Sequence, residues 1–133
     1  MNRRRIETAV AWFTLGALVV YVPAETYVSW TRGLLNPFYV IDATAMALML
    51  WGAAHSLRAR PRPAPGLLCG AYGWAAANGW RATFGRLDEM RAGGELDYGV
   101  AEAWVVGLAT LIAITCFAVL LVLAAVRTPR RGQ

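Results

Sequence analysis

Four long apolar runs, separated by short polar segments, dominate the pattern of this chain. The runs cover approximately residues 8–28, 39–57, 66–84 and 99–126. A helix that spans a bilayer needs about 20 mostly apolar residues. Backbone amides find no water in hydrocarbon, so such runs form helices rather than isolated strands. The pattern therefore predicts an all-α membrane protein, a four-transmembrane-helix bundle that forms a single domain over residues 1–133.

The segments between the runs are typical of loops. Asn36-Pro37 marks a short turn after the first run. In residues 58–65 three prolines alternate with other residues, which excludes a helix there. Residues 86–97 form the most hydrophilic stretch and contain the flexible pair Gly93-Gly94. We therefore expect the third helix to end near residue 84 and a loop to follow.

Composition agrees with a membrane environment. Apolar residues make up 58% of the chain and charged residues 16%, with a mean hydropathy of +0.44; a soluble domain carries roughly 25% charged residues. Two cysteines cannot staple a disulfide scaffold. The 13 basic residues are all arginines, and they form short clusters between the apolar runs rather than one basic face. We therefore expect membrane lipid around the chain and no nucleic-acid partner.

The distribution of arginine also predicts an orientation. Nine of the 13 arginines lie on the side that carries both termini, and four lie near the other side. Arginine is enriched in cytoplasmic segments, so both termini should be cytoplasmic in a multi-pass protein of the plasma membrane.

The first run has a second interpretation. Three arginines, a short apolar stretch and the small residue Ala24 are also typical of a cleaved signal peptide. We expect the segment to be retained as the first helix. Pro23 should then kink or end that helix near its outer end, because its ring blocks a bond to the preceding turn.

Polar groups inside the runs are the candidates for a functional site, because a charge in hydrocarbon is costly. Each run contributes at least one such group toward the same outer side. The groups are Glu25, Asp42, Asn78, Arg81 and Glu102. Helical spacing predicts that they face one another, as a polar cup walled by aromatic side chains. The aromatic candidates are Tyr21, Trp74, Tyr98 and Trp104.

Structural roles are the alternative for each group. Glu25 and Asp42 would then lie at the headgroup level, and Arg81 would form an ion pair with Glu102. Asn78 would make an interhelical hydrogen bond.

Residues outside the cup are expected to be structural. His55 is expected to be an interfacial residue, and Cys69 and Cys116 to be packing residues. No spacing of His, Cys and carboxylate residues indicates a metal or haem site, so we expect no metal and no cofactor.

Small residues recur at helical spacing in the last two runs. They are Gly66, Gly70, Gly73 and Ala77 in the third, and Gly99, Ala103 and Gly107 in the fourth. Small residues let helix backbones approach closely in lipid. We expect these stripes to pack inside the bundle, with a dimer interface as the alternative.

One segment resembles a known family. The sequence Val22-Pro23-Ala24-Glu25-Thr26-Tyr27, followed by Tyr39-Val40-Ile41-Asp42, is similar to integral-membrane terpene cyclases of the meroterpenoid type, over residues 22–51. The resemblance implies acid-initiated cyclisation of a prenyl chain, with Glu25 and Asp42 as catalytic residues. Members of that family are usually longer, so this chain would need to form a homodimer or to use a smaller pocket.

Three functions fit these observations. The first is a small membrane enzyme that performs acid-initiated cyclisation or isomerisation of a lipid-soluble, isoprenoid-like substrate. The second is a proton-coupled transporter or channel subunit with Glu25 as its titrating site, and the third is a non-catalytic assembly subunit. An enclosed pocket open to lipid favours the enzyme, a path through the bundle favours transport, and an exposed polar groove favours the subunit.

Overall fold

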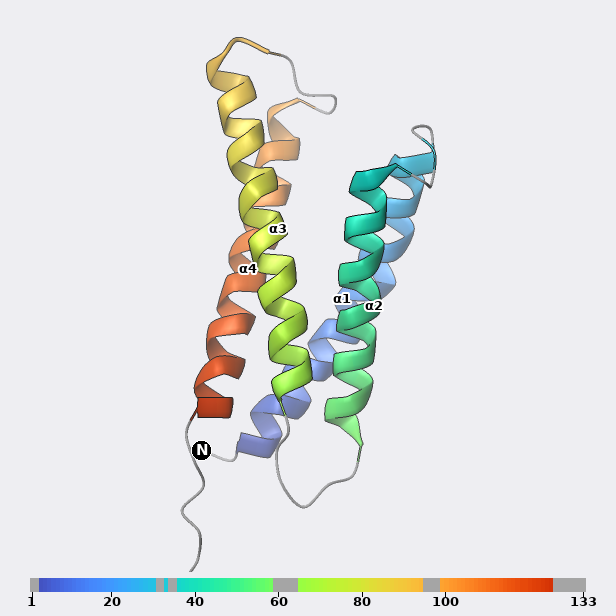
Figure 1. Cartoon of the computed structure of the whole chain (residues 1–133), viewed down its shortest axis with the longest axis vertical. Helices are drawn as coiled ribbons and strands as arrows, with labels where there is room; N and C mark the ends of the chain where they lie inside the picture. The colour runs from blue at the N-terminus through green and yellow to red at the C-terminus, as the bar shows by residue number, and fades with distance from the viewer. Residues whose placement is uncertain (1–2, 31–32, 34–35, 59–64, 95–98, 126–133) are drawn as a thin grey trace, which may run out of the picture.

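The computed structural model describes residues 3–30, 33, 36–58, 65–94 and 99–125, and this part of the chain forms four helices (Figure 1). They are α1 (Arg3–Trp30), α2 (Pro37–Leu57), α3 (Gly66–Arg91) and α4 (Val100–Ala125). The helices run alternately up and down, so the start of α1 and the end of α4 lie together. This end is called the termini end, and the opposite end, where α1 and α3 finish, is called the distal end. The prediction of an all-α, four-helix protein is confirmed.

Three of the helices are long and apolar enough to cross a membrane, namely α1, α2 and α4. This supports a membrane protein. Within the described residues, α3 does not reach the same apolarity. However, α2 finishes at the termini end and α4 starts at the distal end. In a bilayer that holds the other three helices, α3 must therefore cross as well.

The helices pack as two hairpins. α1 packs on α2, α3 packs on α4, and the hairpins meet mainly through α2 and α3, whereas α1 and α4 have little contact. A Cβ atom added at Gly52 of α2 would lie 2.8 Å from the Cα of Leu68 of α3. The backbones therefore touch near the termini end, and the hairpins diverge toward the distal end (Figure 1).

The hydrophobic core lies in the half of the bundle nearer the termini end. Leu68 and Tyr72 of α3 are almost fully buried there, against Ala11 of α1 and Leu120 of α4. The hydroxyl groups of Tyr72 and Thr14 hydrogen-bond at 2.8 Å, so the largest buried side chain also satisfies its polar atom. Because this core occupies the half nearer the termini end, polar side chains can lie between the hairpins in the distal half.

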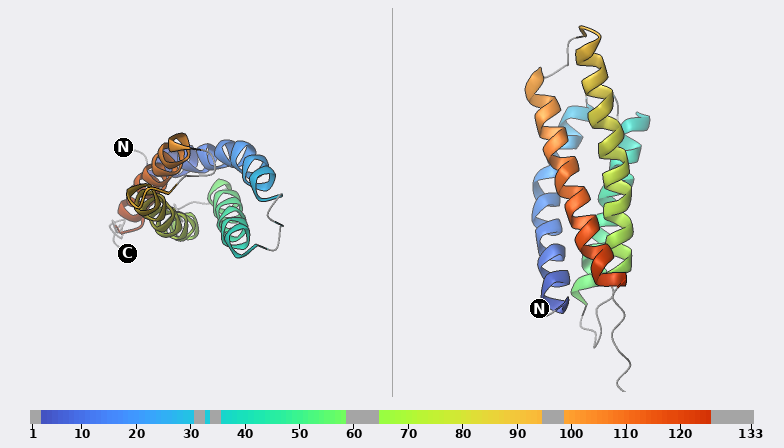
Figure 2. Two further views of the ribbon diagram at one scale, coloured as in Figure 1. Left: turned by 90° about the horizontal axis from the view of Figure 1, so that it is seen from above. Right: turned by 90° about the vertical axis from the view of Figure 1, so that its left-hand side faces the viewer.

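Two helices extend beyond the predicted limits. α1 begins at Arg3 and continues through Pro23 to Trp30, so of the two outcomes predicted for Pro23, a kink or an end of the helix, the end does not occur. Figure 2 shows instead that α1 is bent. α3 continues to Arg91 and not to residue 84, so the beginning of the predicted loop is helical.

The end of α3 has a local cause. Gly93 adopts a positive φ of 78°. Its N–H donates to the carbonyl oxygen of Met90 at 3.2 Å, and the N–H of Gly94 donates to the carbonyl oxygen of Glu89 at 2.9 Å. This is the hydrogen-bonding pattern with which glycine closes a helix. The charged residues that precede Gly93 favour contact with water, but they are compatible with a helix. The helix therefore continues beyond the apolar segment.

The small-residue stripe of α3 does not pack inside the bundle as expected. Gly66, Gly70 and Ala77 are exposed, and Cβ atoms added at the two glycines would meet nothing within 4 Å. Gly73 alone of the four turns toward a neighbouring helix, where it faces the ring of Phe117. The close approach of α3 to α4 instead uses Gly79, whose added Cβ would lie 2.5 Å from Oγ1 of Thr110.

Candidate functional site

One polar side chain from each helix lies near the distal end of that helix. These are Glu25 of α1, Asp42 of α2, Arg86 of α3 and Glu102 of α4, and they are called the distal polar layer. Each lies no more than five residues from the distal end of its helix, which corresponds to about 7.5 Å. All four side chains are half-buried. The layer therefore lies partly inside the bundle, close to the distal ends of the helices, although α3 extends beyond α1 and α2 there (Figure 1).

Two of the carboxyl groups belong to the first hairpin. Asp42 lies within hydrogen-bonding reach of Glu25, and the hydroxyl of Ser29 donates to Oε1 of Glu25 at 3.2 Å. A second contact between the helices joins the hydroxyl groups of Thr26 and Tyr39 at 3.1 Å. The spacing of four residues between Glu25 and Ser29 places both on one face of α1. That face holds the carboxyl pair against the start of α2.

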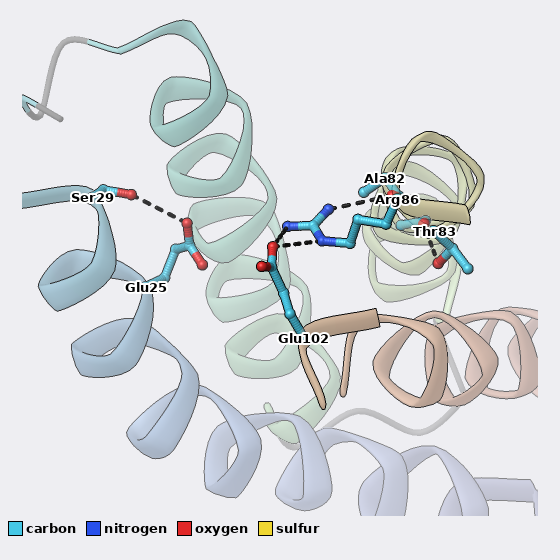
Figure 3. A network of polar contacts seen from close by, with 7 residues as sticks. Glu25, Ser29, Ala82, Thr83, Arg86 and Glu102 are labelled. Carbon is cyan, nitrogen blue, oxygen red and sulfur yellow. Dashed lines mark hydrogen bonds and ion pairs between the residues drawn. The ribbon is translucent and has the colours of Figure 1, made fainter. Parts of the chain in front are cut away.

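The other two members of the layer form an ion pair within the second hairpin. Nε and Nη2 of Arg86 lie 2.7 and 2.6 Å from the same oxygen, Oε1, of Glu102. Nη1 of Arg86 also donates to the carbonyl of Ala82 at 3.3 Å. The side chains are 29% and 18% exposed, so the pair is largely removed from solvent. Figure 3 shows these contacts.

The two halves of the layer face each other across the hairpins. In Figure 3, Glu25 and the Arg86–Glu102 pair point into the same space from three different helices. Arg86 interacts electrostatically with Asp42, and Tyr21 with Asp42, Glu25 and Arg86. The layer thus combines three carboxyl groups with one guanidinium.

The structure brings together Tyr21, Glu25, Asp42 and Glu102 but not Arg81. Arg81 is exposed, and the predicted ion pair with Glu102 is made by Arg86 instead. Each residue turns the helix by about 100°, so the five steps from Arg81 to Arg86 amount to one full turn plus roughly 140°. The two arginines therefore lie on different faces of α3. Sequence reasoning missed Arg86 because it placed this residue in a loop.

The expected aromatic wall is largely absent from the described residues of the layer. Trp74 and Trp104 are 44% and 77% exposed, so both lie on the outer surface of the bundle. The amide of Asn78 donates to the carbonyl of Trp74 in its own helix at 3.0 Å, rather than across helices. Tyr98 lies outside the described residues. Of the four predicted aromatic residues, Tyr21 is the one that interacts electrostatically with members of the layer, although it is itself 41% exposed.

A fourth carboxyl group inside the bundle lies at the termini end. Glu7 is fully buried, and Nη1 of Arg4 lies 3.4 Å from its Oε2. Glu7 belongs to the same buried stripe of α1 as Ala11, Thr14 and Leu18. Extending the first helix back to residue 3 would have revealed it. Within the described residues, no three His, Cys, Asp or Glu side chains are grouped so that they can hold a metal ion.

A shallow groove of about 450 Å³ lies on α2, away from the distal polar layer. Its lining is mostly apolar and comes from a single helix, namely Tyr39, Val40, Ala43, Thr44, Ala47, Leu48 and Trp51. It includes neither Asp42 nor Glu25. This groove is therefore a lipid-facing surface rather than a chamber around the carboxyl groups.

Comparisons with protein-family models, with curated proteins and with solved structures find no match to this chain. The resemblance of residues 22–51 to membrane terpene cyclases thus stays a prediction. The distal polar layer is the feature on which a function can be argued.

Proposed function

We propose that this chain is a small integral-membrane enzyme in which Glu25 and Asp42 protonate a lipid-soluble, isoprenoid-like substrate. One observation carries this proposal. Two carboxyl groups from consecutive apolar helices lie within hydrogen-bonding reach of each other. A proton held between them, in a setting of low dielectric, is available for general acid catalysis.

The chemistry requires only groups of the layer. The carboxyl pair delivers its proton to a carbon–carbon double bond or to an epoxide oxygen, which leaves a carbocation. A second double bond of the same substrate attacks the cation and forms a carbon–carbon bond, and a neighbouring carbon then loses a proton to the carboxylate. The product is an isomer of the substrate, and the acid is regenerated.

Other residues have supporting roles in this proposal. The ring of Tyr21 offers a face that attracts a cation. The pair formed by Arg86 and Glu102 neutralises its own charges and keeps α3 and α4 in register beside the carboxyl pair.

The test is turnover by the purified chain in proteoliposomes. The probes are prenyl alcohols and terminal prenyl epoxides of several chain lengths, incubated in deuterium oxide and examined by mass spectrometry. We expect products isomeric with the substrate, and one carbon-bound deuterium where a double bond is protonated. Glu25→Gln and Asp42→Asn should each lower turnover by at least about 100-fold, because they keep the shape but remove the acid.

The matched control is Asp88→Asn. It makes the same kind of change at the distal end, but Asp88 is 73% exposed and pairs with Arg91 in water. Turnover should therefore be unchanged. A double variant Glu25→Gln, Asp42→Asn that converts a probe at the normal rate would contradict the proposal.

A second candidate function is a proton-coupled transporter or channel subunit with Glu25 as its titrating site. The observation that favours it is the position of the carboxyl pair where the two hairpins diverge, since a change in their separation would alter access to the pair. A pH-sensitive dye inside the same proteoliposomes distinguishes the two functions. Proton flux that is lost in Glu25→Gln, without turnover of any probe, would favour transport. Neither flux nor turnover would favour a non-catalytic assembly subunit.

A further inference from the structure

The apolar groove on α2 leads toward a cation at the termini end. Its lining begins at Tyr39 and finishes at Trp51. Each residue turns a helix by about 100°, so the seven steps from Trp51 to Arg58, the residue that caps α2, amount to nearly two full turns. Arg58 therefore continues the face of α2 that carries the groove. Arg58 is exposed, as is Ala54 between the two.

Arg58 also lies beside the basic start of α1. Nη2 of Arg4 donates to the backbone carbonyl of Arg58 at 2.7 Å, which joins the end of α2 to the first turn of α1. Arg3 and Arg5 flank Arg4 in the chain, so four arginines gather here; they are called the arginine corner. Within the described residues, the side chains of Arg5 and Arg58 are exposed and make no ion pair or hydrogen bond.

The chain supplies little negative charge at the arginine corner. Of the acidic residues that the structure describes, Glu7 alone lies at the termini end, and it is fully buried against Arg4. The first turn of α1 contains no acidic residue, although the start of a helix carries partial positive charge and favours anions. The sequence adds no Asp or Glu in residues 1–2, 59–64 or 126–133. The corner is therefore a positive surface that an external anion would offset.

The length of α2 places the groove and the arginine corner at matching depths in a bilayer. α2 has 21 residues and is about 31 Å long, close to the hydrocarbon thickness of about 30 Å. Arg58 follows its last residue and so lies at the headgroup level of the leaflet at the termini end. One leaflet corresponds to about ten residues of helix. Leu48 and Trp51 therefore lie beside the acyl chains of that same leaflet.

We infer that this face of the chain binds an anionic phospholipid, with an acyl chain along the Trp51 end of the groove and the phosphate against Arg58 and Arg5. One phospholipid molecule joins an apolar chain to a phosphate, as the groove joins the arginine corner. Arginine binds phosphate through paired N–H groups, and each basic residue at a membrane surface adds affinity for anionic lipid. The inference does not rest on the proposed catalytic function.

A second copy of this chain fits the face less well. Two copies in the same orientation hold their arginine corners at the same level, so contact through this face would bring arginine against arginine. Glu7 is buried within its own bundle and offers the other copy no counter-charge. Charge complementarity therefore favours an anionic lipid.

The test follows the fluorescence of Trp51 in liposomes of phosphatidylcholine. Phosphatidylglycerol with brominated acyl chains is included at increasing fractions, and brominated phosphatidylcholine with the same chains is the comparison. Bromine quenches tryptophan at short range, and subtracting the signal of Trp51→Phe isolates Trp51 from the other tryptophans. Trp51 is 59% exposed, so this substitution leaves the core intact. We expect half-maximal quenching at an at least about fivefold lower fraction of phosphatidylglycerol.

Variants link this preference to the arginine corner. Arg58→Gln should reduce it without loss of the bond from Arg4, because that bond uses the backbone carbonyl. Arg5→Gln should also reduce it, and the double variant should abolish it. Arg91→Gln is the matched control, since Arg91 is an exposed arginine at the distal end, and the preference should persist. Ala47→Phe should weaken quenching by both lipids, because Ala47 is exposed and lines the groove.

Three results would overturn the inference. Equal quenching by the two lipids, or a preference that the double variant keeps, would show that the arginines do not select the lipid. Unchanged quenching in Ala47→Phe would remove the acyl chain from the groove. Absence of quenching by either lipid would show that another chain covers this face. The fluorescence does not depend on turnover, so failure here is separate from failure of the proposed function.

Discussion

Arg86 of α3 places two nitrogen atoms, Nε and Nη2, within 2.7 Å of a single oxygen of Glu102 of α4. The two residues are 16 positions apart in sequence and join the second hairpin near its distal end. The contact exists because α3 continues beyond its apolar segment, which turns Arg86 toward α4. It holds α3 and α4 together at the distal polar layer.

Removal of this ion pair should destabilise the chain. Arg86→Gln removes the ion pair that Arg86 makes with the half-buried Glu102, and we expect a loss of about 2 kcal/mol in the free energy of unfolding. Denaturant unfolding in mixed micelles, followed by circular dichroism, measures it. Arg91→Gln is the control, because Arg91 and Asp88 are both more than 70% exposed and such pairs contribute little. Equal losses in both variants would contradict the prediction.

The two kinds of glycine should respond oppositely to alanine. Gly52→Ala places a Cβ atom 2.8 Å from the backbone of Leu68, so the hairpins must move apart, at a cost of about 1–3 kcal/mol. Gly70→Ala meets nothing and should stabilise the isolated chain by up to about 1 kcal/mol, because alanine favours helix. Thermal unfolding of the two variants in the same detergent gives the comparison. A neutral Gly52→Ala would show that α2 and α3 do not touch there.

The buried hydroxyl pair should contribute modestly to stability. Tyr72→Phe removes the bond to Thr14, but Thr14 keeps its bond to the carbonyl of Val10. We therefore expect a loss of about 1 kcal/mol. Tyr27→Phe is the matched control, since Tyr27 is 82% exposed and its change should be close to zero. The same unfolding experiment measures both variants. A larger loss of stability in Tyr27→Phe than in Tyr72→Phe would contradict the burial of Tyr72 in the core.

Topology can be read by cysteine accessibility. Glu89→Cys lies on an exposed position of α3 at the distal end, and Arg58→Cys lies on an exposed position at the termini end. Because arginine predicts cytoplasmic termini, an impermeant maleimide should label the first variant in intact cells and the second only after permeabilisation. Cys69 and Cys116 are replaced by alanine in both. The reverse pattern would place the termini outside.

Part of the candidate site was predictable from position along the helices alone. Glu25, Asp42 and Glu102 lie close to the ends of apolar runs, and because the runs alternate in direction, all three lie toward the distal end. The partner of Glu102 was not predictable in this way. Arg81 and Arg86 differ only in their angle around α3, and that angle matters only once the limit of the helix is known. The limit depends on the turn at Gly93 rather than on hydrophobicity.

The sequence by itself determined the number of helices, their approximate limits and the end of each helix near which a carboxyl group lies, because a bilayer constrains length and apolarity residue by residue. Tertiary structure decided which faces meet. It turned the glycines at 66 and 70 outward, buried Glu7 and left Arg81 exposed, although helical spacing allowed the opposite. Which face of a helix turns toward its neighbours depends on contacts such as Gly52 with Leu68 and Gly79 with Thr110, which join residues far apart in the chain. A pattern of apolar positions cannot encode them when nearly every position on a membrane helix is apolar.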